Sequence, residues 1–118
     1  MMFQALAALA LLAATPLQAG ERLAMRLTPR NAFEPATVTV TATVERDDEN
    51  RAMAIEAESA DFYRSSVVPL EGKDAARTTR IEFRGLPGGQ YVVRTTLLGS
   101  DGRPRASTAQ ELNIIGIR

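Results

Sequence analysis

Residues 85–102 read GLPGGQYVVRTTLLGSDG. A Leu-Pro-Gly-Gly turn stands one residue before Tyr91, and side chains of mostly apolar or β-branched character follow Tyr91 as far as Leu98. Every second residue of an extended chain lies on the same face, so this run predicts a strand. Asp101-Gly102 then supplies the dipeptide that tight β-hairpins prefer. The stretch therefore predicts a sharp turn, a strand and a hairpin in direct succession.

The same period of two residues is clearest in residues 37–44, TVTVTATV. Three valines and one alanine share one face, and four threonines share the other. Threonine is β-branched, so both faces favour extended backbone, whereas only one face is apolar. This pattern is typical of a half-buried antiparallel strand.

Further strands are predicted at residues 23–28, 53–58, 63–70, 79–84 and 105–115. Pro69 restricts its strand to the edge of a sheet, and the poor alternation at the start of 105–115 indicates a bulge. Residues 50–61 are rich in Ala and Glu, which also suits a helix, but the alternation favours a strand. Seven short strands separated by turn signals predict an all-β sandwich.

The segment Leu86-Pro87-Gly88, followed by Tyr91, resembles the corner before strand F in fibronectin type III and bacterial immunoglobulin-like domains. The resemblance extends over residues 21–115 as a pattern of strands. It implies a seven-stranded antiparallel β-sandwich with Greek-key connections, in which the Tyr91 hydroxyl bonds back to the backbone of the corner. The cysteine pair and the tryptophan of antibody domains are missing, which excludes that branch.

The first 19 residues are predicted to be a cleaved signal peptide, which leaves residues 20–118 as the folded domain. Ala5 to Ala14 is an unbroken Ala/Leu run, and Leu17-Gln18-Ala19 resembles a cleavage signal. The run is shorter than the roughly 20 apolar residues that a membrane span needs. We therefore expect a periplasmic or secreted domain without a membrane span in the mature chain.

The amino-acid composition limits the ligands and reactions that the chain can support. Lys and Arg number 14 and Asp and Glu also 14, so no net charge attracts nucleic acid. The chain has no Cys, His or Trp, which removes disulfides, thiol or imidazole catalysis and the usual zinc and copper ligands. We therefore expect no cofactor, no metal and no enzymatic activity.

Asp47-Asp48-Glu49-Asn50 offers oxygen ligands for calcium. It lacks the spacing of a calcium loop, so a solvated loop is favoured and calcium stays the alternative.

The residues that face outward suggest where a partner binds. Phe62 and Tyr63 are adjacent in a strand and must point in opposite directions, so one ring is expected to be exposed beside Arg64. The outward residues of the strands at 53–58 and 91–98, among them Val92, Arg94 and Leu98, are less polar than those of the opposite sheet. The predicted interaction surface comprises Phe62, Tyr63, Arg64, Val92, Arg94 and Leu98.

Together these features predict an exported, non-catalytic module that binds a protein. One alternative is a carbohydrate- or small-ligand-binding module that uses Phe62 and Tyr63. Another is a structural subunit of an envelope assembly, joined by addition of a strand at a sheet edge, with residues 114–117 as the pairing segment.

Overall fold

The computed structural model describes residues 23–117, so the predicted signal peptide, residues 1–19, lies outside the described residues. Within this range the chain forms strands and one short 3-10 turn. The elements are β1 (Leu23–Thr28), β2 (Asn31–Phe33), β3 (Ala36–Val44), β4 (Ala52–Glu58), β5 (Tyr63–Pro69), η1 (Gly72–Asp74), β6 (Thr78–Leu86), β7 (Gly89–Leu98) and β8 (Pro104–Ile115). Residues 50–61 thus contain a strand rather than a helix. Among the described residues, no helix is long and apolar enough to cross a membrane.

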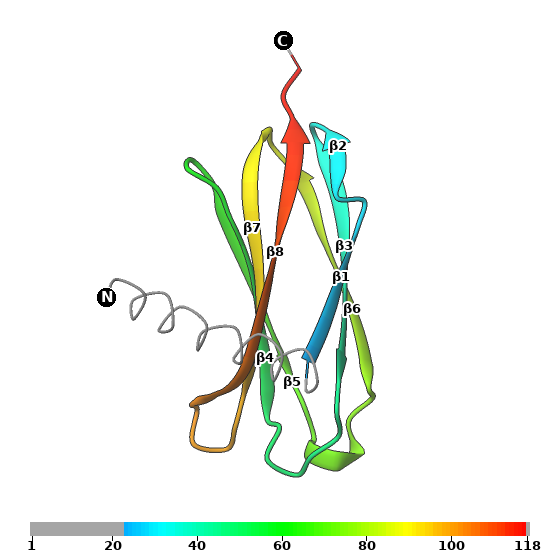
Figure 1. Ribbon diagram of the computed structural model, residues 1–118, viewed down its shortest axis with the longest axis vertical. Helices are drawn as coiled ribbons and strands as arrows, with labels where there is room; N and C mark the ends of the chain where they lie inside the picture. The colour runs from blue at the N-terminus through cyan, green and yellow to red at the C-terminus, as the bar shows by residue number, and fades with distance from the viewer. Residues whose placement is uncertain (1–22, 118) are drawn as a thin grey trace, which may run out of the picture.

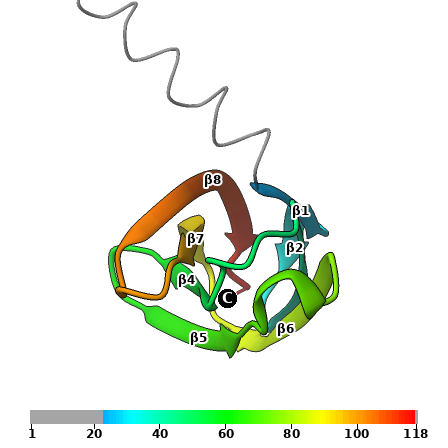
Figure 2. The ribbon, with the colours of Figure 1, turned by 90° about the horizontal axis from the view of Figure 1, so that it is seen from below.

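The strands form two sheets that pack face to face (Figures 1 and 2). One sheet has the order β1-β3-β6 and the other the order β2-β8-β7-β4-β5. The predicted all-β sandwich is confirmed, and β5, which contains Pro69, lies at a sheet edge as expected.

The structure adds one short strand to the seven that the sequence predicts. After Thr28 the chain leaves the three-stranded sheet, and residues 31–33 pair in parallel with the end of β8. The other pairings are antiparallel. A strand of three residues is too short to show an alternating pattern, which is why the sequence indicates only a turn there.

The core lies between the two sheets and is built from the predicted inward faces. In β3, Val38, Val40 and Ala42 are completely buried. In β7, Tyr91, Val93, Thr95 and Leu97 are buried in the same way. The Thr95 hydroxyl is satisfied in this apolar layer because it donates a hydrogen bond to the sulfur of Met25, 3.1 Å away.

The corner between β6 and β7 joins the two sheets, as the resemblance implies. Tyr91 is 1% exposed, and its hydroxyl donates a hydrogen bond to the carbonyl oxygen of Pro87 at 2.7 Å. A Cβ at Gly88 would lie 2.7 Å from the Cα of Gly116, so only glycine lets the corner and the C-terminal segment approach this closely. The corner therefore depends on the hydroxyl of Tyr91 and on the lack of a side chain at Gly88.

The predicted bulge lies at the start of β8. Leu97 pairs with Ala106 and Leu98 with Pro104, so Arg105 is the extra residue in that strand. The hairpin before it closes through the backbone of Gly99 and Arg103, with Gly102 at a φ of 79°. That left-handed conformation is one that glycine adopts without strain.

Two side chains connect the sheets along the open sides of the sandwich. On one side, Arg64 of β5 donates a hydrogen bond to the carbonyl oxygen of Arg84 in β6. On the other side, Gln110 of β8 donates to the carbonyl oxygen of Met25 in β1 at 2.5 Å. These bonds satisfy carbonyl groups on β6 and β1, the two edge strands of the three-stranded sheet.

We predict that Tyr91→Phe lowers the free energy of unfolding by about 1–2 kcal/mol, because the Pro87 carbonyl loses its partner while the ring is kept. The matched control is Tyr63→Phe, whose hydroxyl is bonded at the exposed surface and whose loss should cost less than about 0.5 kcal/mol. Urea unfolding followed by circular dichroism measures both. Equal losses of unfolding free energy in the two variants would show that the hydrogen bond from Tyr91 to Pro87 does not stabilise the corner.

Candidate interaction surface

The outer face of β8, β7, β4 and β5 is the surface on which most predicted interaction residues meet; we call it the outer face. The strand register arranges its side chains in four rows that cross the strands. The rows are Glu111–Val92–Glu58–Tyr63, Ala109–Arg94–Glu56–Ser65, Ser107–Thr96–Ala54–Val67 and Pro104–Leu98–Ala52–Pro69. We call the second the charged row, and the third and fourth the two uncharged rows.

The two uncharged rows give the outer face its character. Their side chains are short or apolar, and Val67 is 64% exposed. The opposite surface, the outward side of β1-β3-β6, carries threonines and charged side chains, including Arg26, Arg80 and Arg84. The difference in polarity that the sequence predicts between the two surfaces is therefore present.

Four of the six predicted interaction residues lie on the outer face. Val92, Arg94 and Leu98 point outward from β7, and Tyr63 lies at the edge strand β5 with 55% of its surface exposed. The Tyr63 hydroxyl donates a hydrogen bond to Oε2 of Glu56 at 2.8 Å. This bond to a carboxylate raises the pKa of Tyr63 above its usual value of 10.0.

The other two predicted residues, Phe62 and Arg64, lie at the open side between β5 and β6. Phe62 packs against the core and meets the ring of Tyr91 edge to face, with centroids 6.3 Å apart. The Arg64 guanidinium lies over the Phe62 ring, 5.1 Å from its centroid. The alternation of the strand turns these residues away from Tyr63. The rings of Phe62 and Tyr63 therefore do not form one platform on which a sugar could stack.

The loop at residues 47–50 is held by hydrogen bonds within the protein. Asn50 is completely buried: its Nδ2 donates to the carbonyl oxygen of Glu45 at 2.9 Å, and its Oδ1 accepts from Arg105 at 2.6 Å. Oδ1 of Asp47 accepts from the backbone N–H of Glu49 at 2.8 Å. Across residues 23–117, no group of three or more His, Cys, Asp or Glu side chains is placed to hold a metal ion. The structure thus gives this loop a structural role.

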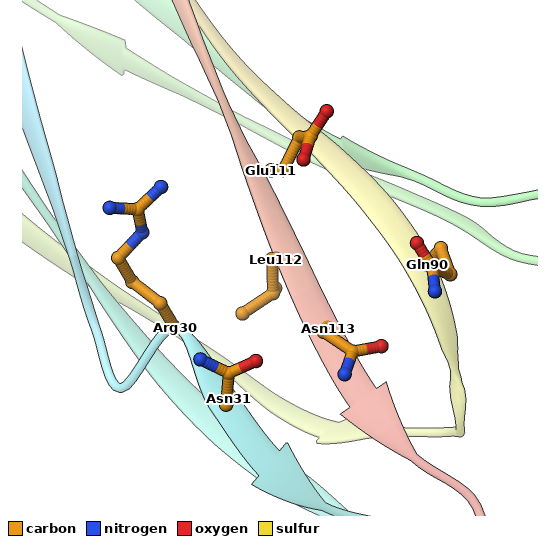
Figure 3. Close-up of a pocket in the computed structure, with 6 residues that line it drawn as sticks. All are labelled: Arg30, Asn31, Gln90, Glu111, Leu112 and Asn113. Carbon is orange, nitrogen blue, oxygen red and sulfur yellow. The ribbon is translucent and has the colours of Figure 1, made fainter.

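A shallow polar depression of about 220 Å³ lies where β2 begins beside β8 (Figure 3). It is lined by Arg30, Asn31, Gln90, Glu111, Leu112 and Asn113. Figure 3 shows Arg30 on the β2 side of β8 and Gln90 on the β7 side. The lining contains neither an aromatic ring nor a nucleophile with a neighbouring base. Sequence reasoning missed it because its residues come from three separate strands and share no motif.

The C-terminal segment 114–117 is engaged within the domain, contrary to its predicted availability as a pairing strand. Ile114 is 2% exposed. Residues 113–115 pair with β2 on one side, and 113–114 also pair with β7 on the other. The backbone N–H of Ile117 donates to Oε2 of Glu34 at 3.0 Å. The prediction of a free segment is wrong because the sequence does not reveal β2, which covers its outer edge.

Comparisons with known proteins support the fold only. No family model and no curated protein matches the chain. Among solved structures, a superoxide reductase (neelaredoxin) from Ignicoccus hospitalis is similar, with a TM-score of 0.64, 11% identity and 82% of each chain covered. The fibronectin(III)-like modules of Clostridium thermocellum CbhA give a TM-score of 0.54 at 11% identity, covering 81% of this chain and 99% of that one. The sulfur carrier protein SoxY from Chlorobium limicola f thiosulfatophilum gives 0.53 at 14% identity, covering 88% and 94%.

These neighbours are different proteins that share one architecture, and a fold of this kind hosts unrelated functions. At sequence identities of 14% or below, these similarities show only that the chain has a β-sandwich fold, and one of the similar structures is a fibronectin(III)-like module. This likeness therefore assigns no function to the chain.

We predict that Glu56→Gln lowers the pKa of Tyr63 toward 10, because an amide no longer penalises the tyrosinate. The chain has two tyrosines, so the change is made in a Tyr91→Phe background, where Tyr63 is the one that titrates. Ultraviolet absorbance at alkaline pH measures the ionisation. An unchanged titration would show that Tyr63 and Glu56 do not interact in solution.

We predict that Asn50→Ala destabilises the domain by about 2–3 kcal/mol, since the change leaves the Glu45 carbonyl without its partner and removes the hydrogen-bond acceptor of the half-buried Arg105, which keeps its ion pair with Asp47. Asn31→Ala, at an exposed position of β2, is the control and should change the free energy of unfolding by less than about 0.5 kcal/mol. Chemical unfolding of both variants tests the difference. If the two alanine variants unfold alike, the buried network does not stabilise the loops.

Proposed function

We propose that the chain is an exported, non-catalytic β-sandwich module that acts by binding a protein partner through the outer face. The observation that carries this proposal is the contrast between the two external surfaces of the sandwich. One belongs to a three-stranded sheet and the other to four strands of a five-stranded sheet, and among the described residues only the outer face has two adjacent rows without a charged side chain.

The arrangement of the outer face resembles the usual anatomy of a protein interface. The two uncharged rows offer short side chains that let another surface approach closely. The charged row and the first row add Arg94, two glutamates on β4 and the Tyr63 hydroxyl. An apolar area bordered by polar groups with hydrogen-bonding capacity is typical of protein–protein interfaces.

The non-catalytic part of the proposal is supported by the character of the interior and the composition. The space between the sheets is filled by buried apolar side chains. The absence of His and Cys from the sequence removes the side chains that most often act as a base or nucleophile near neutral pH. Export rests on the sequence of residues 1–19, and a periplasmic or secreted location is part of the proposal.

The two alternatives receive less support from the geometry. A carbohydrate-binding module would need an accessible aromatic platform, and Phe62 packs against Tyr91 instead. An assembly joined through residues 114–117 would need a free segment, and these residues are already paired with β2 and held by Glu34.

We predict that the double variant Val92→Glu/Leu98→Glu abolishes capture of the partner from an envelope extract, because both changes place carboxylates on the proposed interface. The matched control is Thr39→Glu/Thr43→Glu, which adds the same charges to the outward side of β3. Circular dichroism should show that both variants remain folded. If the two double variants capture partners equally well, the outer face is not the binding surface.

A further inference from the structure

We infer that the partner that fits the outer face is a second copy of this chain, packed face to face about a two-fold axis that runs parallel to the strands between β7 and β4. This inference rests on the proposed function, because it takes the outer face as a protein-binding surface. It goes further by naming the occupant and the side chains that meet.

The rows of the outer face determine what such a rotation brings together. An axis parallel to the strands keeps each row at its own level and reverses the order of strands within it. β7 then faces the partner's β4, and β8 faces the partner's β5. Two packed sheets keep their strands within about 30° of each other, so the alignment of rows holds best near the axis, where β7 and β4 lie.

The charged row is complementary to itself under this rotation. Arg94 of β7 and Glu56 of β4 are neighbours across the strands. In the dimer, Arg94 faces the partner's Glu56, and Glu56 faces the partner's Arg94. Each chain therefore supplies one cation and one anion, and the symmetry produces two opposite-charge contacts close to the axis. Complementary charges of this kind fix the register of an interface.

The remaining rows are compatible with the same arrangement. In the two uncharged rows, Thr96 faces the partner's Ala54 and Leu98 faces the partner's Ala52. These short side chains let the sheets approach closely near the axis. In the first row, Val92 faces the partner's Glu58, whose position at the end of the patch is exposed, and at the flanks Tyr63 faces the partner's Glu111. In none of the four rows does the rotation place two like charges opposite each other.

A two-fold axis perpendicular to the strands fits less well. Between the second and third rows, it would bring Arg94 to the partner's Thr96 and Glu56 to the partner's Ala54. At the level of the charged row, it would bring Arg94 to the partner's Arg94. In either position the charges would lose water without gaining an opposite charge as partner, which costs free energy. The parallel axis is therefore the arrangement that the charges support.

The outer face is small for a permanent interface. Four strands at about 4.8 Å spacing and seven residues at about 3.4 Å each define a patch of roughly 19 by 24 Å. A standard interface buries about 800 Å² on each partner, and this patch is clearly smaller than that. We therefore expect a reversible dimer that dissociates on dilution.

The test introduces charge-reversing substitutions into the predicted mature chain, residues 20–118. Arg94→Glu gives each outer face only negative charge in the charged row, and Glu56→Arg gives it only positive charge. Each variant alone should weaken self-association by at least about a hundredfold, because both contacts near the axis become repulsive. Sedimentation velocity over a series of protein concentrations measures the dissociation constant.

An equimolar mixture of these two variants should restore the dimer, since the introduced carboxylate meets the introduced guanidinium and the native pair stays opposed. The double variant Arg94→Glu/Glu56→Arg should dimerise like the native chain. The control is Arg80→Glu, an equal charge change on the exposed outward side of β6, which should leave the dissociation constant unchanged.

The outcomes separate this inference from the proposed function. A native chain that stays monomeric to millimolar concentration, or a mixture that fails to associate, overturns the second copy as partner. If Val92→Glu/Leu98→Glu still abolishes capture of a different protein, the proposed function stands without it. A dimer that responds to Arg80→Glu and not to either reversal on the outer face also overturns this inference, and the capture experiment then decides the proposed function by itself.

Discussion

The arrangement of the strands depends on the burial of Tyr91 beneath the crossing from β6 to β7. The chain changes sheets between Leu86 and Gly89, and a turn inside the sandwich leaves backbone carbonyls without strand partners. The Tyr91 hydroxyl satisfies the carbonyl of Pro87, and its ring fills the space below the turn beside Phe62. Gly88 lets the turn lie against Gly116. The corner thus fixes where β7 begins, and the register of β7 places every row of the outer face.

The sequence predicts the sandwich well because its buried faces impose a continuous period of two. Residues 37–44 and 91–98 show this most clearly, and both strands have the predicted inward faces. The bulge near Arg105 is visible as a break in the alternation. β2 is not predictable in this way, since its three residues belong to the sheet only through parallel pairing with β8. The predicted availability of residues 114–117 is wrong for the same reason.

The candidate site is predictable only in part. Alternation shows that Val92, Arg94 and Leu98 point outward, but it does not show that Arg94 lies beside Glu56, because that depends on the register between strands far apart in sequence. Phe62 and Arg64 lie at the side of the sandwich rather than on the outer face. Phe62 is placed there by its contact with Tyr91 and Arg64 by its bond to the Arg84 carbonyl, and no local pattern encodes either contact. Asn50 and Arg105 are 55 residues apart, so their buried contact is equally invisible in the sequence.

The alanines of β4 are the strongest reason to regard the outer face as more than solvated surface. Outward positions of a sandwich strand are free of core packing, and β3 fills them with threonine, which is β-branched and polar. β4 places Ala52 and Ala54 in the same kind of position, although alanine is depleted in strands and offers water no hydrogen bond. Alanine gains there only if small size matters, as it does where another surface must approach the sheet closely. The proposed function accounts for the alanines of β4, whereas the stability of the strand itself does not.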